Sequence, residues 1–266
     1  MLMTQDYADH AVRIAEIAAK AARGYFRGRL GIEFKEDESP VTQADKGVEA
    51  EVRVYLQRNF PDHGIYGEEH GIEGADRDDI WIIDPIDGTK NFVRGVPVWA
   101  TLIALVDEGE PVVGVVSAPA LGKRWWAAKG AGAYMGRSLA AATRLRVSNI
   151  SELSDASLSY SSLGGWKQRG NLDEFLGLTE EVWRTRAYGD FWSYCLVAEG
   201  AVDIACEPEL NLYDMAALVP IVTEAGGRFT SLEGEDGPFG GNALATNSIL
   251  HSEVLKRLNP GLDDLL

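Results

Sequence analysis

The chain has 266 residues, of which 45% are hydrophobic and 25% charged, a composition typical of a globular protein that can bury a sizeable core. Its 41 acidic and 25 basic residues give a formal net charge of -16. This balance argues against a nucleic acid or an anionic membrane as a partner, because both bind to basic surfaces. A phosphorylated substrate remains open, since bound divalent cations reverse the sign of the charge locally.

The sequence shows no pattern of a membrane anchor or a secretion signal. No apolar run approaches the roughly 18 residues that a membrane-spanning helix requires. Acidic residues, Asp6 and Asp9 among them, fall within the N-terminal helical pattern, which is unlike a signal peptide. The two cysteines, Cys195 and Cys206, lack CxxC spacing and are expected to be buried, reduced thiols. We therefore expect a cytoplasmic protein.

The first half of the sequence predicts two helices followed by a sheet. Apolar residues recur at helical spacing over residues 4–28, and a second helical pattern covers 44–59, after a polar segment broken by Pro40. The stretch "GIYGEEHG" then reads as a short strand that ends in an acidic turn. Strand-like runs follow as far as residue 135, separated by glycines and acidic turns, which is typical of an antiparallel sheet.

Near residue 140 the pattern changes to short strands that alternate with helices. The strand-like runs are "DASLSYS" and "AVDIACEP", and the helical runs are "FLGLTEEVW", "DFWSYCLVAEG" and "YDMAALVPIVTEAGG". Such alternation is typical of an α/β unit. We therefore expect an N-terminal α+β subdomain, residues 1–142, and a C-terminal α/β subdomain, residues 143–266. The interface between two such units is a common place for an active site.

Acidic residues follow apolar runs at three distant places in the sequence. Glu68 and Glu69 end the first of these runs, Asp84 ends "WIID", and Asp214 stands at the expected start of a helix. Each place has an ordinary interpretation on its own. The glutamates could be solvated turn charges, Asp84 before a proline could open a turn, and Asp214 could cap its helix.

The segment "WIIDPIDGTKNF", residues 81–92, is harder to explain by structure alone. Asp84 and Asp87 stand three positions apart around a turn, so both carboxylates and the carbonyl of Ile86 can face one side. Such oxygens suit hard cations such as Mg²⁺, and a buried acid needs a positive partner. Gly88 and Thr89 then open a short helix whose free N–H groups suit a phosphate. The combination predicts phosphoryl transfer at a metal site.

The motifs "GEEHG", "WIIDPIDGTKNF" and "YDMAALVPIVTEAGG" resemble those of the inositol monophosphatase family. The family patterns are approximately GEE, DPIDGTxNF and WDxAAxxxIxxEAGG, and Tyr213 stands where the family usually has Trp. Their order and separations also match, so the resemblance covers nearly the whole chain. It implies a layered αβαβα sandwich, Mg²⁺-dependent hydrolysis of a small phosphomonoester, and a homodimer.

The resemblance implies two or three Mg²⁺ ions per site, with Mn²⁺ as an alternative. Glu68, Asp84 and the carbonyl of Ile86 would hold one ion, and a third, weaker ion would also use Glu68. Asp84, Asp87 and Asp214 would hold a second ion, so that Asp84 bridges the pair. Two such ions can activate a water molecule and stabilise the leaving oxygen in an in-line displacement.

Further roles follow from the same resemblance. Thr89 would position the attacking water, and Asp45 would be its acidic hydrogen-bond partner, with Glu68 as the third catalytic residue. The backbone N–H groups of Gly88 and Thr89 would meet the phosphate. Asp87 and Asp214 would also face the substrate.

The alcohol side of the site departs from the general family pattern. Where the family usually has small residues, the sequence has Asp190, Phe191 and Trp192, and Glu207 precedes Asp214 by seven positions. Acids with aromatic residues suit a cationic or planar alcohol. The block from Arg186 onward resembles the histidinol-phosphate phosphatase branch, which implies L-histidinol phosphate as substrate and Arg186 as a pocket residue.

Other interpretations stay open. Phe191 and Trp192 could be core residues of a helix that Asp190 caps. Within the same family the alternative is an inositol-1-monophosphatase or another sugar-phosphate phosphatase. From a different class, the alternative is a regulatory binding protein, against which the intact acidic motifs and Thr89 argue.

Overall fold

The computed structural model describes the whole chain except residues 1–3, 29–31, 35–39, 138–140 and 261–266. The helices of the described part are α1 (Thr4–Tyr25), α2 (Gln43–Asn59), α3 (Thr89–Val93), α4 (Gly164–Arg169), α5 (Leu172–Glu181), α6 (Asp190–Ala198), α7 (Leu212–Met215), α8 (Leu218–Glu224) and α9 (His251–Leu258). No helix among these described residues is long and apolar enough to cross a membrane.

Two sheets and a short ribbon complete the described part. The larger sheet contains, in spatial order, β10 (Ala142–Arg144), β9 (Gly132–Gly136), β8 (Lys123–Ala128), β7 (Glu110–Ala118), β6 (Ala100–Asp107), β5 (Asp79–Asp87), β3 (Gly64–Gly67) and β4 (Gly71–Glu73). The smaller sheet contains β12 (Arg184–Arg186), β11 (Ser157–Ser159), β13 (Ile204–Glu207), β15 (Ala243–Thr246) and β14 (Arg228–Thr230). The antiparallel ribbon pairs β1 (Ile32–Phe34) with β2 (Pro40–Thr42).

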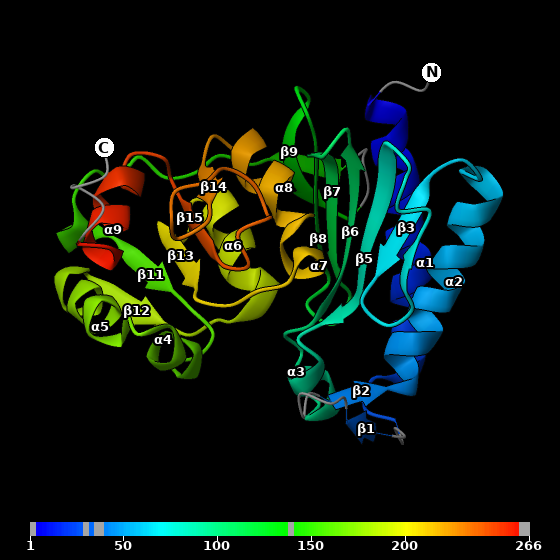
Figure 1. Cartoon of the computed structure of the whole chain (residues 1–266), viewed down its shortest axis with the longest axis horizontal. Coiled ribbons are helices and arrows are strands. Elements are labelled where there is room, and N and C mark those ends of the chain that lie inside the picture. The colour runs from blue at the N-terminus through cyan, green and yellow to red at the C-terminus, as the bar shows by residue number, and fades with distance from the viewer. Residues whose placement is uncertain (1–3, 29–31, 35–39, 138–140, 261–266) are drawn as a thin grey trace.

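The elements stack in five layers, as Figure 1 shows. Helices α1 and α2 cover the outer face of the larger sheet, and α6, α7 and α8 lie between the two sheets. Helices α4, α5 and α9 cover the far side of the smaller sheet. The predicted αβαβα arrangement is therefore confirmed. The change of sheet falls between Arg144 and Ser157, whereas the division into subdomains at 142/143 stays a prediction.

The N-terminal helices agree closely with the sequence pattern. Helix α2 begins one residue earlier than predicted, and α1 ends at Tyr25, three residues before the predicted end. The chain turns there because Arg27 has a positive φ of 61°, which a right-handed helix does not allow. The face of α1 that packs on the sheet is built largely of buried alanines, whose small side chains let the helix lie close to the strands.

The antiparallel pairing predicted for residues 81–135 is present from β5 to β9. Strand β3, in contrast, pairs parallel to β5, with Gly67 opposite Ile83. Because parallel strands end at the same edge of a sheet, the residues that follow Gly67 and Ile83 lie side by side. These residues are Glu68 and Asp84.

The larger sheet meets the middle helices at a point of very close approach. A Cβ atom on Gly114 of β7 would lie 2.1 Å from the carbonyl oxygen of Ala217 and 2.7 Å from Pro220 Cγ. Glycine is therefore required for α8 to pack on β7. The predicted helical run "YDMAALVPIVTEAGG" is divided into α7 and α8. Pro220 lies in the first turn of α8, where a missing backbone N–H is tolerated.

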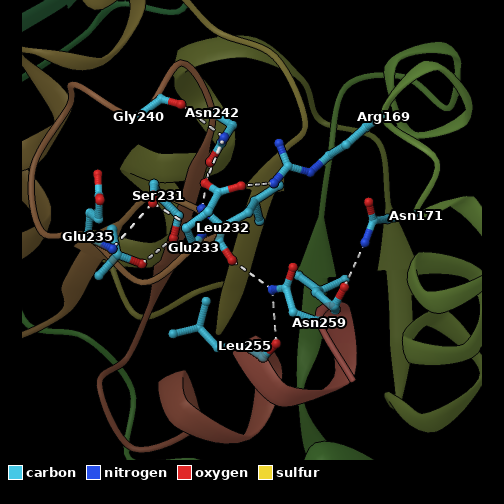
Figure 2. Close-up of polar contacts among 12 residues, drawn as sticks. Arg169, Asn171, Ser231, Leu232, Glu233, Glu235, Gly240, Asn242, Leu255 and Asn259 are labelled. Atoms are coloured by element: carbon cyan, nitrogen blue, oxygen red, sulfur yellow. Dashed lines mark hydrogen bonds and ion pairs between the residues drawn. The ribbon is translucent and has the colours of Figure 1, made fainter. Parts of the chain in front are cut away.

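A network of polar contacts holds the loop after β14 in the C-terminal half of the chain (Figure 2). The side chain of Asn242 accepts from the N–H of Leu232 at 2.5 Å and donates to the carboxylate of Glu233 at 3.1 Å. Glu233 also pairs with Arg169 at the end of α4, and Asn259 Nδ2 donates to the Leu232 carbonyl at 2.6 Å. The loop after β14 is thus fixed to both α4 and α9.

His251, the first residue of α9, is buried in this half. Its two ring nitrogens lie 2.9 Å from Thr230 Oγ1 and 3.0 Å from Thr246 Oγ1. Burial, with a smaller effect of Arg228, lowers the pKa of His251 from 6.5 to about 4.

We expect His251 to make the folded protein sensitive to acid. Because its pKa is lower in the folded state, the unfolded chain binds the proton first. Its stabilising contribution is therefore complete above pH 6.5 and is lost as the pH falls toward 4. The loss amounts to at most about 3 kcal/mol. Urea unfolding of the wild type and of His251→Gln should show a stability difference that shrinks between pH 7 and pH 5. A difference independent of pH would contradict this.

Candidate active site

The acidic residues of the sequence motifs come together where the two halves meet. Asp84 lies within the buried part of β5, and Glu68 follows β3, its N–H donating to the carbonyl of Ile83 at 3.2 Å. Between Asp84 and Asp87 the register of β5 against β6 shifts by one residue, which marks an irregularity in the strand. Such a bulge redirects side chains, and here it lets both aspartates face the same side.

Asp214 reaches this cluster from the C-terminal half. It is the third residue of α7 and forms a capping box with Asn211, whose N–H donates to Asp214 Oδ2 at 2.7 Å. One carboxylate oxygen from each of Asp84, Asp87 and Asp214 lies within 4.8 Å of the others. Asp214 therefore stabilises the start of α7, and it also adds a third acid beside Asp84 and Asp87.

The electrostatics of the cluster are those of an anionic site that requires a cation. Burial, followed by the charges of Glu68 and Asp87, raises the pKa of Asp84 well above its ordinary value. Burial likewise raises the pKa of Asp214 to about 6. Asp84 is 1% exposed, and its Oδ1 has no hydrogen-bond partner among the described residues. An orphaned carboxylate oxygen among oxygen donors fits a hard divalent cation.

Thr89 and Asp45 are in contact beside this cluster. The Thr89 hydroxyl lies 3.3 Å from Asp45 Oδ1 and 2.9 Å from the carbonyl oxygen of Ile86. Asp45 is 1% exposed, and its other oxygen accepts from the N–H and the hydroxyl of Thr42 at 2.8 and 2.5 Å. The start of α2 therefore holds Asp45 rigidly, and Asp45 in turn orients Thr89.

A cavity of about 660 Å³ opens next to the acids. It is lined by Glu68, Gly88, Thr89, Lys90, Asn91, Val96, Val98, Ser161, Ser162, Ala187, Tyr188, Gly189, Asp190 and Trp192. Gly88 has a φ of +81°, and a Cβ atom there would lie 2.9 Å from the Val98 carbonyl oxygen. Glycine is thus required at this wall of the cavity. The volume suits a small organic molecule.

Asp190 enters the cavity from the start of α6 in a strained conformation. Its φ is +47°, uncommon for a residue other than glycine. Its N–H donates to Ser161 Oγ at 2.9 Å, and Asn91 Nδ2 donates to Asp190 Oδ2 at 3.0 Å. The next N–H, of Phe191, donates to Asp87 Oδ2 at 2.8 Å. The start of α6 therefore joins the cavity to the acidic cluster.

Glu207 lies behind Ser161, at the end of β13. It is 5% exposed, and its Oε1 accepts a short hydrogen bond from the Ser161 hydroxyl. Burial, together with the charges of Asp190 and Asp214, raises the pKa of Glu207 to about 8, against the lowering effect of Ser161. A cation bound nearby would favour the ionised form of Glu207, because an opposite charge lowers the pKa of a carboxyl group.

Arg186 differs from the other predicted pocket residues. It is exposed on β12, and its guanidinium donates to the carbonyl of Thr185 at 2.7 Å. The neighbouring Ala187 lines the cavity, whereas Arg186 does not. A substrate contact by Arg186 stays a prediction.

Comparison with known proteins identifies the family of this chain. A model of the inositol monophosphatase family matches residues 3–263. The chain belongs to this family. Among curated family relatives, the histidinol-phosphatase of Streptomyces coelicolor is 57% identical over 263 residues, covering 96% of this chain and 98% of the relative. The histidinol-phosphatase of Mycobacterium tuberculosis is 56% identical over 260 residues, covering 97% and 100%.

Solved structures of the inositol monophosphatase family have the same fold. The Thermotoga maritima IMPase superimposes with a TM-score of 0.85 at 30% identity, covering 98% of this chain and all of that one. The inositol monophosphatase of Anabaena gives a TM-score of 0.83 at 32% identity, covering 96% and 95%. The family is one of metal-dependent phosphatases that act on small phosphomonoesters, so the chain is an enzyme of this class.

Three residues of the site were not predicted from the sequence: Glu49, Asn91 and Ser161. Glu49 is fully buried and accepts from the N–H groups of Glu69 and His70 at 2.7 and 3.2 Å, which fixes the acidic turn after β3. A signal for Glu49 exists, because it stands four positions after Asp45 on the buried face of α2. Ser161 follows a short strand and carries no such signal.

Proposed function

We propose that the chain hydrolyses L-histidinol phosphate to L-histidinol and phosphate, a reaction of histidine biosynthesis. The observation that carries this proposal is the acidic wall of the cavity beside the cluster, where Asp190 lines the cavity and Glu207 lies behind Ser161, whose hydroxyl also accepts from the Asp190 N–H. L-histidinol carries an ammonium group and an imidazole, which suit an anionic pocket. The names of the two curated relatives described above point the same way.

Mg²⁺ is the metal that we propose for the acidic cluster. Glu68, Asp84, Asp87, Asp214 and the carbonyl of Ile86 would hold two or three ions, a donor set made entirely of oxygen atoms. Bound Mg²⁺ supplies a Lewis acid that activates water and stabilises the leaving oxygen. Mn²⁺ accepts similar ligands and is the alternative ion.

The protein itself would orient the attacking water through Thr89. With its hydroxyl proton directed at Asp45 Oδ1, Thr89 Oγ1 presents lone pairs that accept a hydrogen bond from water. Asp45 is then placed to take the hydroxyl proton as Thr89 takes one from the water. The phosphate would lie against the turn formed by Gly88 and Thr89, which lines the cavity.

The alcohol would occupy the part of the cavity lined by Asp190, Tyr188 and Trp192. The rings of Tyr188 and Trp192 lie 5.6 Å apart at an angle of 57° and form an aromatic wall. A cation or a flat ring is stabilised against such a wall. Asp190, held by Asn91, would pair with the positive charge of the alcohol.

Three further expectations are also proposals: a cytoplasmic location, a homodimer, and two subdomains divided at 142/143. Light scattering of the purified protein tests the dimer directly, since the monomer mass is 28.9 kDa. Limited proteolysis tests the subdomains, because a hinge between them would be cleaved first.

The first experiment is phosphate release with Mg²⁺ from L-histidinol phosphate and from myo-inositol 1-phosphate in parallel. We expect kcat/KM to favour histidinol phosphate by about 100-fold or more, which corresponds to about 2.7 kcal/mol of transition-state discrimination. A preference for inositol phosphate would refute the proposed substrate and leave the metal site in place. An inactive protein with either ester in Mg²⁺ would contradict the enzymatic assignment.

A further inference from the structure

A second cavity, of about 370 Å³, lies between the C-terminal turns of α1 and the ends of β7, β8 and β9. Its lining residues are Ala19, Arg23, Ser117, Pro119, Gly122, Lys123, Arg124, Gly136 and Arg137. Four of these carry a positive charge and none is acidic, in a chain with a net charge of -16. The cavity shares no lining residue with the active-site cavity. We refer to it as the basic cavity.

The basic cavity carries more positive charge than its surroundings neutralise. Arg124 pairs with Glu16 at 3.1 Å, and Lys123 pairs with Glu199 at 3.0 Å. Arg23 uses its Nε to bond the carbonyl of Ala19 at 3.0 Å, a contact that leaves its charge uncompensated. In the described part of the chain neither Arg23 nor Arg137 forms an ion pair. Two positive charges therefore remain in excess at this cavity.

Arg124 is the most enclosed of the three arginines that line the basic cavity. Its side chain is only 12% exposed, and its Nε is buried without a hydrogen-bond partner in the described part of the chain. A buried donor without an acceptor is uncommon in native structures. This enclosed Nε is out of reach of an anion in the basic cavity, to which Arg124 offers only its Nη groups, one of them already paired with Glu16.

We propose that the basic cavity binds a small phosphorylated anion with more than one negative charge, at a site separate from the active site. Planar guanidinium groups bind phosphoryl oxygens in pairs, and the three arginines offer such donors around one space. The volume suits a small metabolite and lies at the lower end of the usual range for ligand pockets, about 300 Å³ upward.

Lys123 contacts the residue that ends α6, so an anion in the basic cavity would lie next to the C-terminal end of that helix. Glu199 caps the end of α6 and accepts from Lys123 and from Trp125 Nε1, the latter at 2.8 Å. The first turn of the same helix donates to Asp87 through Phe191. Because α6 spans about 13 Å, an anion that competes for Lys123 acts on a helix that reaches the acidic cluster. An anion bound in the basic cavity would therefore act as an effector, through α6, on the acidic cluster.

Calorimetric titration with inorganic pyrophosphate in excess EDTA tests the proposal. Without metal the active site is a cluster of acids that repels anions, so binding there is suppressed. At constant ionic strength we expect wild-type binding with a Kd of about 1 mM or below. The double variant Arg23→Gln/Arg137→Gln should weaken it at least about tenfold. Both arginines are exposed, so the fold should be unaffected.

The matched control is Arg58→Gln/Arg146→Gln, which removes the same charge from two exposed arginines away from the basic cavity. It should bind pyrophosphate like the wild type. In protein labelled with 5-fluorotryptophan, the ¹⁹F resonance missing from Trp125→Phe should shift on titration of the wild type and stay fixed in Arg23→Gln/Arg137→Gln. Absence of wild-type binding, equal binding by the Arg23/Arg137 variant, or equal weakening in the control would each overturn the proposal.

Discussion

Replacing Asp84 by Asn is expected to lower kcat/KM for any phosphomonoester by about 10³-fold or more, at least about 4 kcal/mol of transition-state stabilisation. Asn has almost the same shape as Asp but lacks the negative charge that a divalent cation requires. Asp84 is the acid whose buried Oδ1 has no partner in the described structure, so no other group there takes over its role. Steady-state assays over a range of Mg²⁺ concentrations measure the loss.

The same substitution should stabilise the metal-free protein. Burial and the neighbouring acids raise the folded-state pKa of Asp84 above 3.8, so its destabilising effect is absent below that pH and grows as the pH rises. In EDTA at pH 8, Asp84→Asn should therefore be more stable than the wild type by about 1–3 kcal/mol in urea unfolding. Added Mg²⁺ should stabilise the wild type and have little effect on the variant.

The exposed Asp76 provides the control, since Asp76→Asn removes the same charge without touching the cluster. It should leave both activity and metal-dependent stabilisation unchanged. Retention of more than about a tenth of the activity by Asp84→Asn would refute its role as a bridging ligand.

The second large effect concerns substrate choice. Asp190→Asn should lower kcat/KM for L-histidinol phosphate by about 30- to 150-fold, roughly 2–3 kcal/mol, because a buried cation would lose its partner. Asn tolerates the positive φ at this position, and its amide oxygen can still accept from Asn91, so the start of α6 should be preserved. Hydrolysis of myo-inositol 1-phosphate should change by less than about threefold, since that alcohol has no positive charge.

Glu209→Gln is the matched control for this charge change, because Glu209 is exposed two residues beyond Glu207. It should affect neither substrate. If Asp190→Asn reduces the hydrolysis of both substrates equally, the carboxylate supports the site in general and does not select a cationic alcohol.

The local elements and the acidic motifs were predictable, whereas the contacts that complete the site were not. The helical spacing of apolar residues predicts α1 and α2 to within three residues, because one face of each helix must be buried. Asp84, Asp214 and Glu68 could be grouped because each follows an apolar run, and Asp87 because it stands three positions after Asp84. Their common location depends on the parallel pairing of β3 with β5, a long-range contact that no local pattern specifies.

The pocket residues show the same division. Asp190 stands out as an acid beside aromatic residues and Glu207 as an acid seven positions before Asp214, but the serine between them carries no such signal. Ser161 joins two elements that are 29 and 46 positions away, and a serine after a strand is common in any loop. Arg186 was predicted by resemblance alone. Its side chain bonds the neighbouring carbonyl, because β12 is the edge strand of the smaller sheet.

The acidic cluster draws its members from both halves of the chain, and this has a consequence for biosynthesis. Glu68, Asp84 and Asp87 leave the ribosome more than a hundred residues before Asp214, and all three belong to the half that is translated first. The nascent larger sheet can therefore form with two fewer carboxylates crowding Asp87, since Asp190 and Asp214 are still to be made. The full repulsion arises only when α6 and α7 dock, which makes docking the step at which available metal ions would assist maturation.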